Sequence, residues 1–489
     1  MLRQCCHHQL KNKINRTLLP RLRFSSTKVD TDIHRIPPQL NLQYYANNTE
    51  TIANNMKLRN YEPESAFLFK ELYQQHLELK QTSETLREAR DQVNAQIREA
   101  STKAERDQHI SKAKAWKDQI RQVEEKLVSV EEAMTAQALL IPNDTHADTP
   151  LGPETNAKII KTVGEPRMST PQTPLMDHVD IAEKLDMIDF EQAALVTGSK
   201  FYYLKNYGAW LEFALIQYAM HKAASKGFTP VLAPDMVRTS IAYGCGFQPR
   251  KKEASQIYNV TTASTANTTA PPLCLVGTAE IPLAGLSAKK MFKEDELPRR
   301  IVGFSHAFRA EAGHGSAEER GLYRVHQFSK VELFAVTTPE QSEAMMEEMR
   351  SLQEEMFTEL GLCFRILDMP TEELGASAYR KYDMEAWMPG KNGWGEISST
   401  SNCTDYQTRR LDVRYLSKGF KENVGPKDTR VPWHIKENWV NYCHTLNGTA
   451  MAVPRTIIAL LETHQSPDGT VNLPLPLRKW IPGEPSILK

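Results

Sequence analysis

Residues 308–336 read FRAEAGHGSAEERGLYRVHQFSKVELFAV, and this stretch decides the fold prediction. Two apolar ends flank a polar, glycine-containing loop, which predicts a strand, a loop and a second strand. Because side chains alternate between the two faces of a strand, the second strand would carry five unlike residues on one face. These are Arg324, His326, Phe328, Lys330 and Glu332. Such a face is unsuited to a hydrophobic core and indicates a binding surface.

The spacing on this face suits a ligand with a flat base at one end. Phe328 and Glu332 would lie about 13 Å apart along the strand, roughly the reach from an adenine to a group attached at its α-phosphate. A ring stacks on a purine, and an arginine fork such as that of Arg309 grips a phosphate or a carboxylate. The strand alone leaves a second interpretation open, a ladder of ion pairs on an exposed sheet.

Three other segments carry compatible chemistry. In TAE (278–280), a hydroxyl and a carboxylate follow a short apolar run and suit an ammonium group. EISS (396–399) predicts a short strand with the hard oxygen ligands that Mg²⁺ prefers. Residues 447–462 predict a turn of small residues and then a helix that begins at Pro454. Arg455 would then lie in the first helical turn, where a bound anion would offset its unfavourable interaction with the helix dipole. Taken singly, each of these segments is also compatible with an ordinary solvated surface.

Composition limits the classes of function. The chain has 489 residues, enough for two domains, and its 60 Lys+Arg balance 60 Asp+Glu, so any nucleic-acid site must be a local patch. No apolar run approaches the roughly 20 residues that span a bilayer, so no membrane association is expected. The seven cysteines form no Cys-x-x-Cys pair, which argues against a zinc site or a disulfide framework and favours a reducing compartment.

The first 29 residues carry seven Lys/Arg and no acid before Asp30. This composition is typical of a mitochondrial transit peptide, which we assign to residues 1–35, and it predicts a location in the mitochondrial matrix. A disordered basic tail is the alternative.

Residues 64–141 contain neither glycine nor proline over 78 positions and are rich in strong helix formers. One helix of that length would extend about 117 Å with its apolar stripe unburied. We therefore predict an antiparallel coiled-coil hairpin that folds back near residues 100–106; a dimerising coiled coil is the alternative.

Beyond Pro142 a larger domain begins. Helices are expected over 178–196, 201–226 and 345–360, and the Ser/Thr-rich segment 259–272 is expected to be a mobile surface insertion. Strands mixed irregularly with helices predict an α+β fold.

These segments occur together and in order, and in that combination the chain resembles the seryl-tRNA synthetases of the bacterial and organellar type, a family of class II aminoacyl-tRNA synthetases. KGFTPVLAP (226–234) is similar to the family's first motif, the opening stretch to the second and NGTAMAVPR (447–455) to the third. IPN (141–143) resembles the junction between the family's arm and its catalytic domain. The resemblance implies an antiparallel sheet flanked by helices, dimerised through the first motif, and an N-terminal hairpin.

The same resemblance implies a domain order and a reaction. Residues 36–150 would form a tRNA-binding domain whose arm spans about 64–139, and residues 151–489 the class II catalytic domain. The enzyme would activate L-serine with ATP to seryl-adenylate and then transfer serine to the 3′ end of tRNA(Ser) in mitochondrial translation. The arm would contact the long variable arm of that tRNA. A non-catalytic synthetase-like protein that binds RNA or a partner, and a structural coiled-coil protein with an unrelated globular tail, are the alternatives.

Roles carried over from the resemblance fall on four segments. The serine-binding residues would be Thr278, Ala279, Glu280, Glu332 and Thr449. The ATP-binding residues would be Arg309, Ala310, Glu311, Val325, His326, Gln327, Phe328, Glu396, Ile397, Ser398, Ser399 and Arg455. Of these, the catalytic residues would be Arg309, Arg455 and Glu396. Mg²⁺ would be ligated by Glu396 and Ser399, and no zinc is expected.

Three positions depart from the family pattern. Pro454 stands where a small residue or glycine is usual, and Thr400 where a cysteine is common. SAEER (316–320) replaces a frequent Arg-Asp-Thr-Arg sequence in the second-motif loop, so contacts to the tRNA acceptor end are the least supported by the resemblance.

Overall fold

The computed structural model describes residues 36–248, 256–261, 271–311, 321–418 and 439–489. The predicted transit peptide, most of the Ser/Thr-rich insertion and the SAEER loop lie outside the described residues. Residues 37–489 pack as one compact unit.

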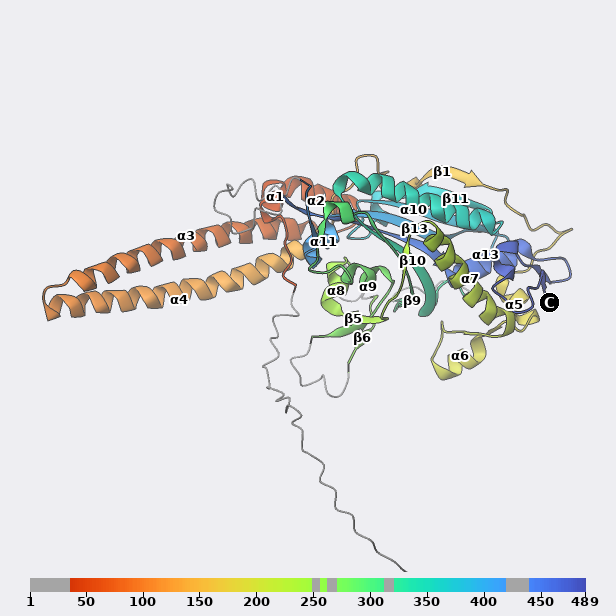
Figure 1. The fold of residues 1–489 in the computed structure, drawn as a ribbon, viewed down its shortest axis with the longest axis horizontal. Coiled ribbons are helices and arrows are strands. Elements are labelled where there is room, and N and C mark those ends of the chain that lie inside the picture. Colours follow the sequence, from red (N-terminus) through yellow and green to blue (C-terminus); the bar gives the residue numbers. More distant parts are fainter. Residues whose placement is uncertain (1–35, 249–255, 262–270, 312–320, 419–438) are drawn as a thin grey trace, which may run out of the picture. The chain divides into compact units, whose positions relative to one another are not determined.

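The N-terminal helices are α1 (Leu42–Asn47), α2 (Thr49–Leu58), α3 (Glu64–Glu99) and α4 (Lys103–Leu140). The last two run antiparallel, side by side, as the predicted hairpin (Figure 1). With 36 and 38 residues, each extends about 55 Å. The fold-back occurs at the expected place, because Thr102 caps α4 in a reciprocal capping box with Glu105.

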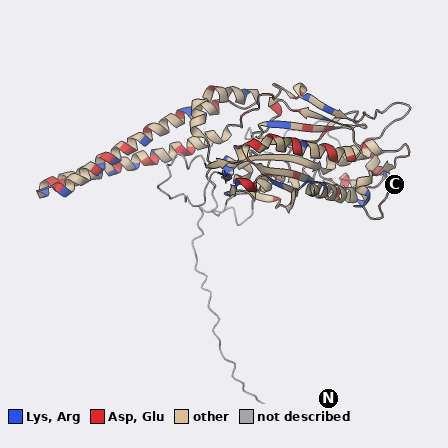
Figure 2. Cartoon of the chain, turned by 45° about the horizontal axis from the view of Figure 1, so that its top comes forward, with Lys and Arg blue, Asp and Glu red and all other residues tan. Residues whose placement is uncertain are grey.

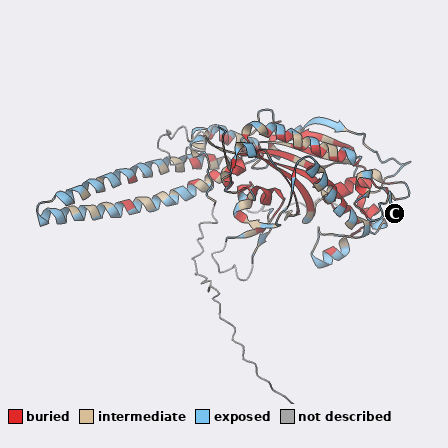
Figure 3. Cartoon of the chain, viewed as in Figure 1, coloured by how far each residue is buried: buried red, intermediate tan, exposed pale blue. Residues whose placement is uncertain are grey.

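The hairpin carries both signs of charge along its length (Figure 2). An ion pair of 2.6 Å between Arg87 and Glu124 joins its two helices. Most of its side chains are exposed, whereas the central sheet is buried (Figure 3). Near its base, Phe69, Met134 and Ala138 join a small apolar cluster with Ile52 and Met56 of α2.

A buried arginine joins the hairpin base to the larger domain. Arg59, which follows α2 and is fully buried, donates hydrogen bonds to backbone carbonyl oxygens of Asn143, Asp144, Gly375 and Ala378. Five donors in a rigid fork suit such a convergence of carbonyls, so the junction is held by directional bonds as well as by packing.

The larger domain is built on an eight-stranded sheet. In spatial order its strands are β1 (Lys158–Val163), β11 (Phe364–Asp368), β12 (Arg380–Met388), β13 (Gly393–Thr404), β16 (His444–Ala452), β10 (Gln327–Thr337), β9 (Arg299–Phe308) and β4 (Thr229–Leu232). Every neighbouring pair is antiparallel except β9 and β4. The predicted α+β fold, an antiparallel sheet with helices against it, is confirmed.

The described part of the chain also contains nine further α-helices, three short 3₁₀ helices (Glu154–Asn156, Glu294–Glu296 and Thr371–Glu373) and ten short strands. The helices are α5 (His178–Lys184), α6 (Phe190–Val196), α7 (Asn206–Ser225), α8 (Thr239–Gly244), α9 (Glu280–Gly285), α10 (Pro339–Glu359), α11 (Tyr406–Leu411), α13 (Val453–His464) and α14 (Leu475–Arg478). The strands are β2 (Ile188–Asp189), β3 (Tyr203–Leu204), β5 (Met236–Arg238), β6 (Asn259–Val260), β7 (Leu273–Leu275), β8 (Met291–Lys293), β14 (Arg414–Leu416), β15 (Val440–Tyr442), β17 (Val471–Asn472) and β18 (Ile487–Leu488).

Contacts with helix α10 show which residues of the central strands β13 and β16 face the helix and which face the opposite side of the sheet. A β-carbon built on Gly448 would lie 3.0 Å from Gln353 and Met349 of α10, so this position of β16 faces the helix. Thr400 is opposite Gly448 in register and hydrogen-bonds Gln353, so the residue that replaces the family's common cysteine also faces α10. Thr449, the next residue after Gly448, faces the opposite side of the sheet.

Two helix predictions are confirmed and one is wrong. Helices α7 and α10 lie where residues 201–226 and 345–360 predict them. The predicted helix over 178–196 is interrupted, because Asp189 leaves the helix to pair in β2 and its carboxylate then caps α6 at the Gln192 N–H (3.0 Å).

Three predictions about strands and loops need correction. Arg324 and His326 precede β10, because the His326 N–H donates to the Lys200 carbonyl instead of the sheet ladder. Residues 447–452 form part of β16, not a turn, because small side chains let that central strand pack against α10. The start of the insertion predicted over 259–272 is also a strand, since β6 pairs with β7.

Candidate active site

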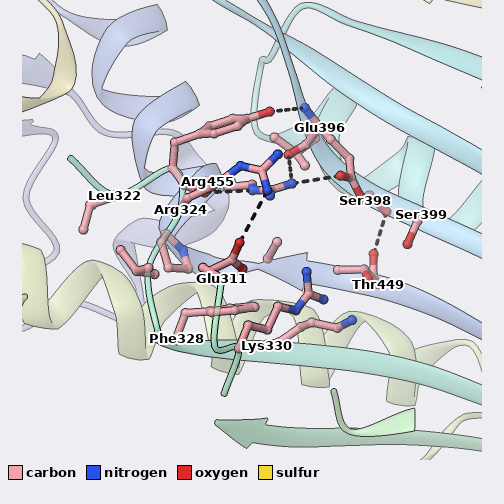
Figure 4. Close-up of a pocket in the computed structure, with 16 residues that line it drawn as sticks. Glu311, Leu322, Arg324, Phe328, Lys330, Glu396, Ser398, Ser399, Thr449 and Arg455 are labelled. Carbon is pink, nitrogen blue, oxygen red and sulfur yellow. Dashed lines mark hydrogen bonds and ion pairs between the residues drawn. The ribbon is translucent and has the colours of Figure 1, made fainter. Parts of the chain in front are cut away.

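A pocket opens beside β10, β13 and the start of α13 (Figure 4). Ten residues with roles implied by the sequence line it: Arg309, Glu311, Val325, Phe328, Glu396, Ile397, Ser398, Ser399, Thr449 and Arg455. Six others complete the lining: Leu322, Tyr323, Arg324, Lys330, Ala452 and Pro454. Segments more than 140 residues apart therefore converge on one cavity.

Two cations meet in this pocket. The Arg455 guanidinium donates to a Glu396 carboxylate oxygen at 2.9 Å and to the Tyr323 carbonyl at 3.2 Å. The Arg309 guanidinium lies 5.3 Å from the centre of the Phe328 ring. Burial lowers the pKa of Arg309, and the nearby positive charge of Arg455 lowers it further. Two half-buried guanidinium groups that repel each other form a site that an anion would stabilise.

The segment predicted to bind Mg²⁺ places two oxygen donors on one side of β13. The pairing of β13 with β12 slips by one residue at Ile397. Glu396 and Ser399 are three positions apart and would face opposite sides of a regular strand, but this bulge turns both to the same side of β13. Burial would raise the pKa of Glu396, but the charges of Arg455 and Lys381 lower it to about 2. The segment thus offers an ionised carboxylate and a hydroxyl side by side.

A buried carboxylate lies close to these two oxygen donors. Asp383 is opposite Ser399 in the sheet, and its Oδ1 is buried without a hydrogen-bond partner among the described residues. Oxygen donors of this kind fit a hard cation, and the described residues contain no cluster of three or more His, Cys, Asp or Glu that would hold a metal unaided. These protein oxygens therefore fit a Mg²⁺ ion whose remaining ligands come from a phosphate.

Residues predicted to bind serine form a second cluster beside the pocket, and of the five only Thr449 lines it. Glu332 is buried, and its carboxylate pairs with Lys330 Nζ at 2.8 Å and accepts from Thr449 Oγ1 at 3.5 Å. Phe328, Lys330 and Glu332 share one strand face, as predicted. The Arg309 Nε donates to the Gly277 carbonyl at 3.4 Å, so the 278–280 segment begins next to Arg309.

Glu280 is the most perturbed carboxyl group of this cluster. Burial, and next the negative charge of Glu332, raise the pKa of Glu280 to about 8. Amide groups of Gln407 and Asn447 both donate to its Oε1, at 2.6 and 2.9 Å. Thr278 and Ala279 are buried directly before it, at the start of α9.

Three residues with implied ATP contacts do not line the pocket. His326 Nδ1 lies 2.9 Å from the Arg309 carbonyl, and the Ala310 N–H donates to Gln256. Gln327 lines a neighbouring cavity with Phe201 and Tyr202. Of these three residues, His326 contacts the pocket residue Arg309, through its Nδ1 and through its carbonyl, which accepts from the Arg309 N–H at 2.9 Å.

Two family profiles match the chain. The profile described as "Seryl-tRNA synthetase N-terminal domain" matches residues 40–145, and that described as "tRNA synthetase class II core domain (G, H, P, S and T)" matches residues 264–426. The serine–tRNA ligase of Treponema denticola is 40% identical over 440 residues, which cover 89% of this chain and 97% of that protein.

The chain belongs to the seryl-tRNA synthetase family. It is also 40% identical to the mitochondrial serine–tRNA ligase of Schizosaccharomyces pombe, across 90% of this chain and 88% of that one. The solved seryl-tRNA synthetase of Pyrococcus horikoshii, complexed with ATP, superposes with a TM-score of 0.79 at 31% identity and covers 92% of this chain and 99% of that one. The protein is therefore a serine–tRNA ligase, an enzyme of the class II, ATP-using type.

Sequence reasoning missed several residues that hold the functional side chains of this synthetase in place. The Tyr323 hydroxyl accepts from the Glu396 N–H at 3.1 Å, and its carbonyl accepts from Arg455. Gln407 and Asn447 hold Glu280. Asn447 lies within the third motif, which is a usable signal, but nothing in the local sequence marks Tyr323 or Gln407 as part of the site.

Within the described residues, no helix has both the length and the apolar character required to traverse a bilayer.

Proposed function

We propose that the pocket of Figure 4 binds ATP with Mg²⁺ next to L-serine and forms seryl-adenylate. The observation that carries this proposal is the meeting of Arg309 and Arg455, 146 residues apart in the chain, in one pocket with Phe328. Arg309 binds the α-phosphate and the serine carboxylate, Arg455 binds the γ-phosphate, and Phe328 stacks on adenine. Pyrophosphate leaves when the serine carboxylate attacks the α-phosphorus.

No general base is required for this step. The serine carboxylate is already ionised at neutral pH, so catalysis depends on alignment and on stabilisation of the developing charge. Mg²⁺, when bound through Glu396 and Ser399, supplies positive charge next to the phosphate oxygens. The terminal ribose hydroxyl of tRNA(Ser) then attacks the adenylate carbonyl, the bond to the phosphate oxygen breaks, and AMP leaves as the seryl group passes to the tRNA.

ATP–pyrophosphate exchange with a panel of amino acids tests the proposal. We expect exchange with serine and at most a trace with alanine, glycine or threonine. Absence of serine-dependent exchange in the full-length protein would instead favour the non-catalytic alternative, a synthetase-like protein that binds RNA or a partner.

Selection of serine is assigned to Glu332. A buried carboxylate left without its hydroxyl partner by alanine is destabilising, so a site built around this bond rejects analogues that lack it. We expect Glu332→Ala to reduce the serine-over-alanine ratio of kcat/KM by about a hundredfold, while KM for ATP changes far less. Exchange kinetics with each amino acid measure the ratio, and an unchanged ratio would refute the assignment.

Serine binding should release a proton near neutral pH. The pKa of Glu280 is raised to about 8 in the protein without serine, and an ammonium group placed beside this carboxyl group favours its ionised form. The enzyme alone therefore holds the Glu280 proton more tightly than the enzyme–serine complex does. Serine affinity should accordingly rise between about pH 6.5 and 8. Calorimetric titration with serine in two buffers of different ionisation enthalpy measures the release. Proton uptake on binding, or equal heats in both buffers, would contradict the role of Glu280.

The same group predicts the direction of a stability change. A carboxyl group whose pKa is raised in the folded state contributes most to stability below its ordinary pKa, near 4.5, and the contribution is lost as pH rises through about 8. Glu280→Gln should flatten both the serine and the stability dependence on pH in this range.

We assign residues 36–150 to tRNA binding and residues 151–489 to catalysis. An exposed hairpin of about 55 Å is long enough to reach a tRNA element far from the acceptor end. Lys and Arg side chains lie along it among the acidic residues and could contact phosphates (Figure 2). The variable arm of tRNA(Ser) is the proposed contact.

The proposed homodimer uses the edge of the sheet at β4. Leu232 of the first motif, on β4, is 82% exposed, and Trp210 and Phe213 are exposed on α7, the helix that precedes this motif and contacts β4. Large apolar side chains next to an unpaired strand edge are typical of a subunit interface.

A role in mitochondrial translation, with the enzyme in the matrix, rests on two observations. The first 29 residues have the basic, acid-free composition of a transit peptide. Relatives at 40% and 44% identity carry the name "Serine--tRNA ligase, mitochondrial", although bacterial relatives are equally close.

A further inference from the structure

One segment of the pocket wall is held by a buried histidine that the reaction itself does not use. The segment is residues 321–324, which return from the second-motif loop, and its Leu322 N–H donates to His178 Nε2 at 3.2 Å. A β-carbon on Gly321 would lie only 2.2 Å from the same nitrogen. His178 and this segment are therefore in close contact, and the glycine permits it.

The other ring nitrogen of His178 faces the helix that carries Arg455. His178 Nδ1 lies 3.1 Å from Glu462 Oε1, and the His178 backbone N–H donates to the same oxygen at 3.0 Å. The second carboxylate oxygen accepts from the Gly390 N–H at 2.8 Å. Because Nε2 accepts from Leu322, Nδ1 carries the proton and donates to Glu462. The imidazole thus bridges α13 to the pocket wall with one bond in each direction.

The residue after Leu322 touches two proposed ATP-binding groups. The Tyr323 carbonyl accepts from Arg455 Nε at 3.2 Å, and its ring centre lies 4.6 Å from the Arg455 guanidinium. Its hydroxyl accepts from the Glu396 N–H at 3.1 Å. A shift of Leu322 would therefore move a side chain that orients both Arg455 and Glu396.

We propose that His178 is a positioning residue for ATP: by joining Glu462 of α13 to the Leu322 N–H, it sets Tyr323 so that Arg455 and Glu396 face the triphosphate. The inference rests on the proposed ATP site. Arg455 and Glu462 lie about two turns apart on one helix, so the same bridge fixes the helix and the wall against each other. His178 touches no substrate; its effect reaches ATP through Tyr323.

Two substitutions separate the two bonds of the imidazole. In His178→Gln, the side-chain oxygen sits near the former Nε2 and keeps an acceptor for Leu322. In His178→Asn, the amide sits near the former Nδ1 and keeps a donor for Glu462, but the Leu322 N–H loses its acceptor. We expect His178→Asn to raise KM for ATP in the exchange reaction by about fivefold to tenfold, with KM for serine within about twofold of wild type. His178→Gln should remain within about twofold for both.

His464→Asn is the matched control. His464 is a partly buried imidazole on the same helix whose Nε2 lies 2.8 Å from the Leu360 carbonyl, away from the pocket. Its loss should affect thermal stability but leave both KM values unchanged. Equal KM changes in the Asn and Gln variants of His178, or equal rises for ATP and serine, would overturn the positioning role and leave a structural one.

A second route avoids dependence on the folding of the His178 variants. Gly321→Ala leaves the imidazole intact but pushes a methyl group against Nε2, so KM for ATP should rise in the same selective way. Normal KM for ATP in Gly321→Ala would overturn the proposal. Arg455→Ala, measured in parallel, separates failure of the His178 proposal from failure of the proposed ATP site. If Arg455→Ala retains a normal KM for ATP, the ATP site itself is wrongly assigned.

Discussion

Arg309→Ala is expected to reduce serine-dependent ATP–pyrophosphate exchange by about a thousandfold or more. Loss of one preorganised donor to a developing charge lowers kcat by about a hundredfold to a thousandfold, and Arg309 is assigned to both the α-phosphate and the serine carboxylate. The partner contacts support this double role, because the guanidinium lies between Phe328 and the segment that leads to Glu280. Exchange rates at saturating ATP and serine measure the effect.

Two further variants test whether the charge or the planar shape of Arg309 accounts for the loss of exchange, and whether the loss is specific to this position. Arg309→Lys keeps the charge but not the planar fork, so an intermediate loss is expected. Arg299→Ala, at the exposed start of β9, the strand that ends directly before Arg309, should exchange at the wild-type rate. A near-normal rate for Arg309→Ala, with the protein folded, would remove Arg309 from the mechanism.

Shortening the hairpin should abolish efficient tRNA charging and leave serine activation intact. Replacing residues 80–128 with a short glycine-containing turn removes the distal hairpin but keeps the apolar cluster around Phe69 and Met134 at its base. His76 faces Glu131 at 3.5 Å and Arg87 faces Glu124 at 2.6 Å, so the two cut points are close to opposite each other. We expect kcat/KM for tRNA(Ser) to fall by at least about a hundredfold, because the phosphate contacts of the hairpin are lost.

The exchange reaction is the control for this variant. It should stay within about twofold of wild type, since the described pocket contains no residue of the hairpin. Normal charging of tRNA(Ser) would refute tRNA binding by the hairpin. A parallel loss of exchange would instead mean that the hairpin supports the fold of the catalytic domain.

Local sequence patterns were sufficient to predict those elements whose residue spacing lies within one segment of the chain. The hairpin follows from an uninterrupted helical stretch with a polar tip, and the shared face of Phe328, Lys330 and Glu332 follows from strand alternation. The same rule failed for His326, because a backbone bond to Lys200 draws it out of the ladder. Alternation also would have placed Glu396 and Ser399 on opposite faces, and a bulge at Ile397 brings them together.

Contacts between distant segments could not be predicted in this way. The Tyr323 hydroxyl bonds Glu396, 73 positions away, and its carbonyl bonds Arg455, 132 positions away. No repeating pattern within a single helix or strand predicts such bonds. His178 was expected only as the start of a long amphipathic helix. Its role as a bridge emerges from the fold, which brings Glu462 and the Leu322 N–H to its two nitrogens.

A structure of the enzyme with L-serine, Mg²⁺ and a non-hydrolysable α,β-methylene analogue of ATP tests the central claim most directly. We predict adenine against Phe328, the α-phosphate on Arg309, the γ-phosphate on Arg455 and the serine ammonium group beside Glu280. A triphosphate bound elsewhere, or one that contacts only one of the two arginines, would contradict the account.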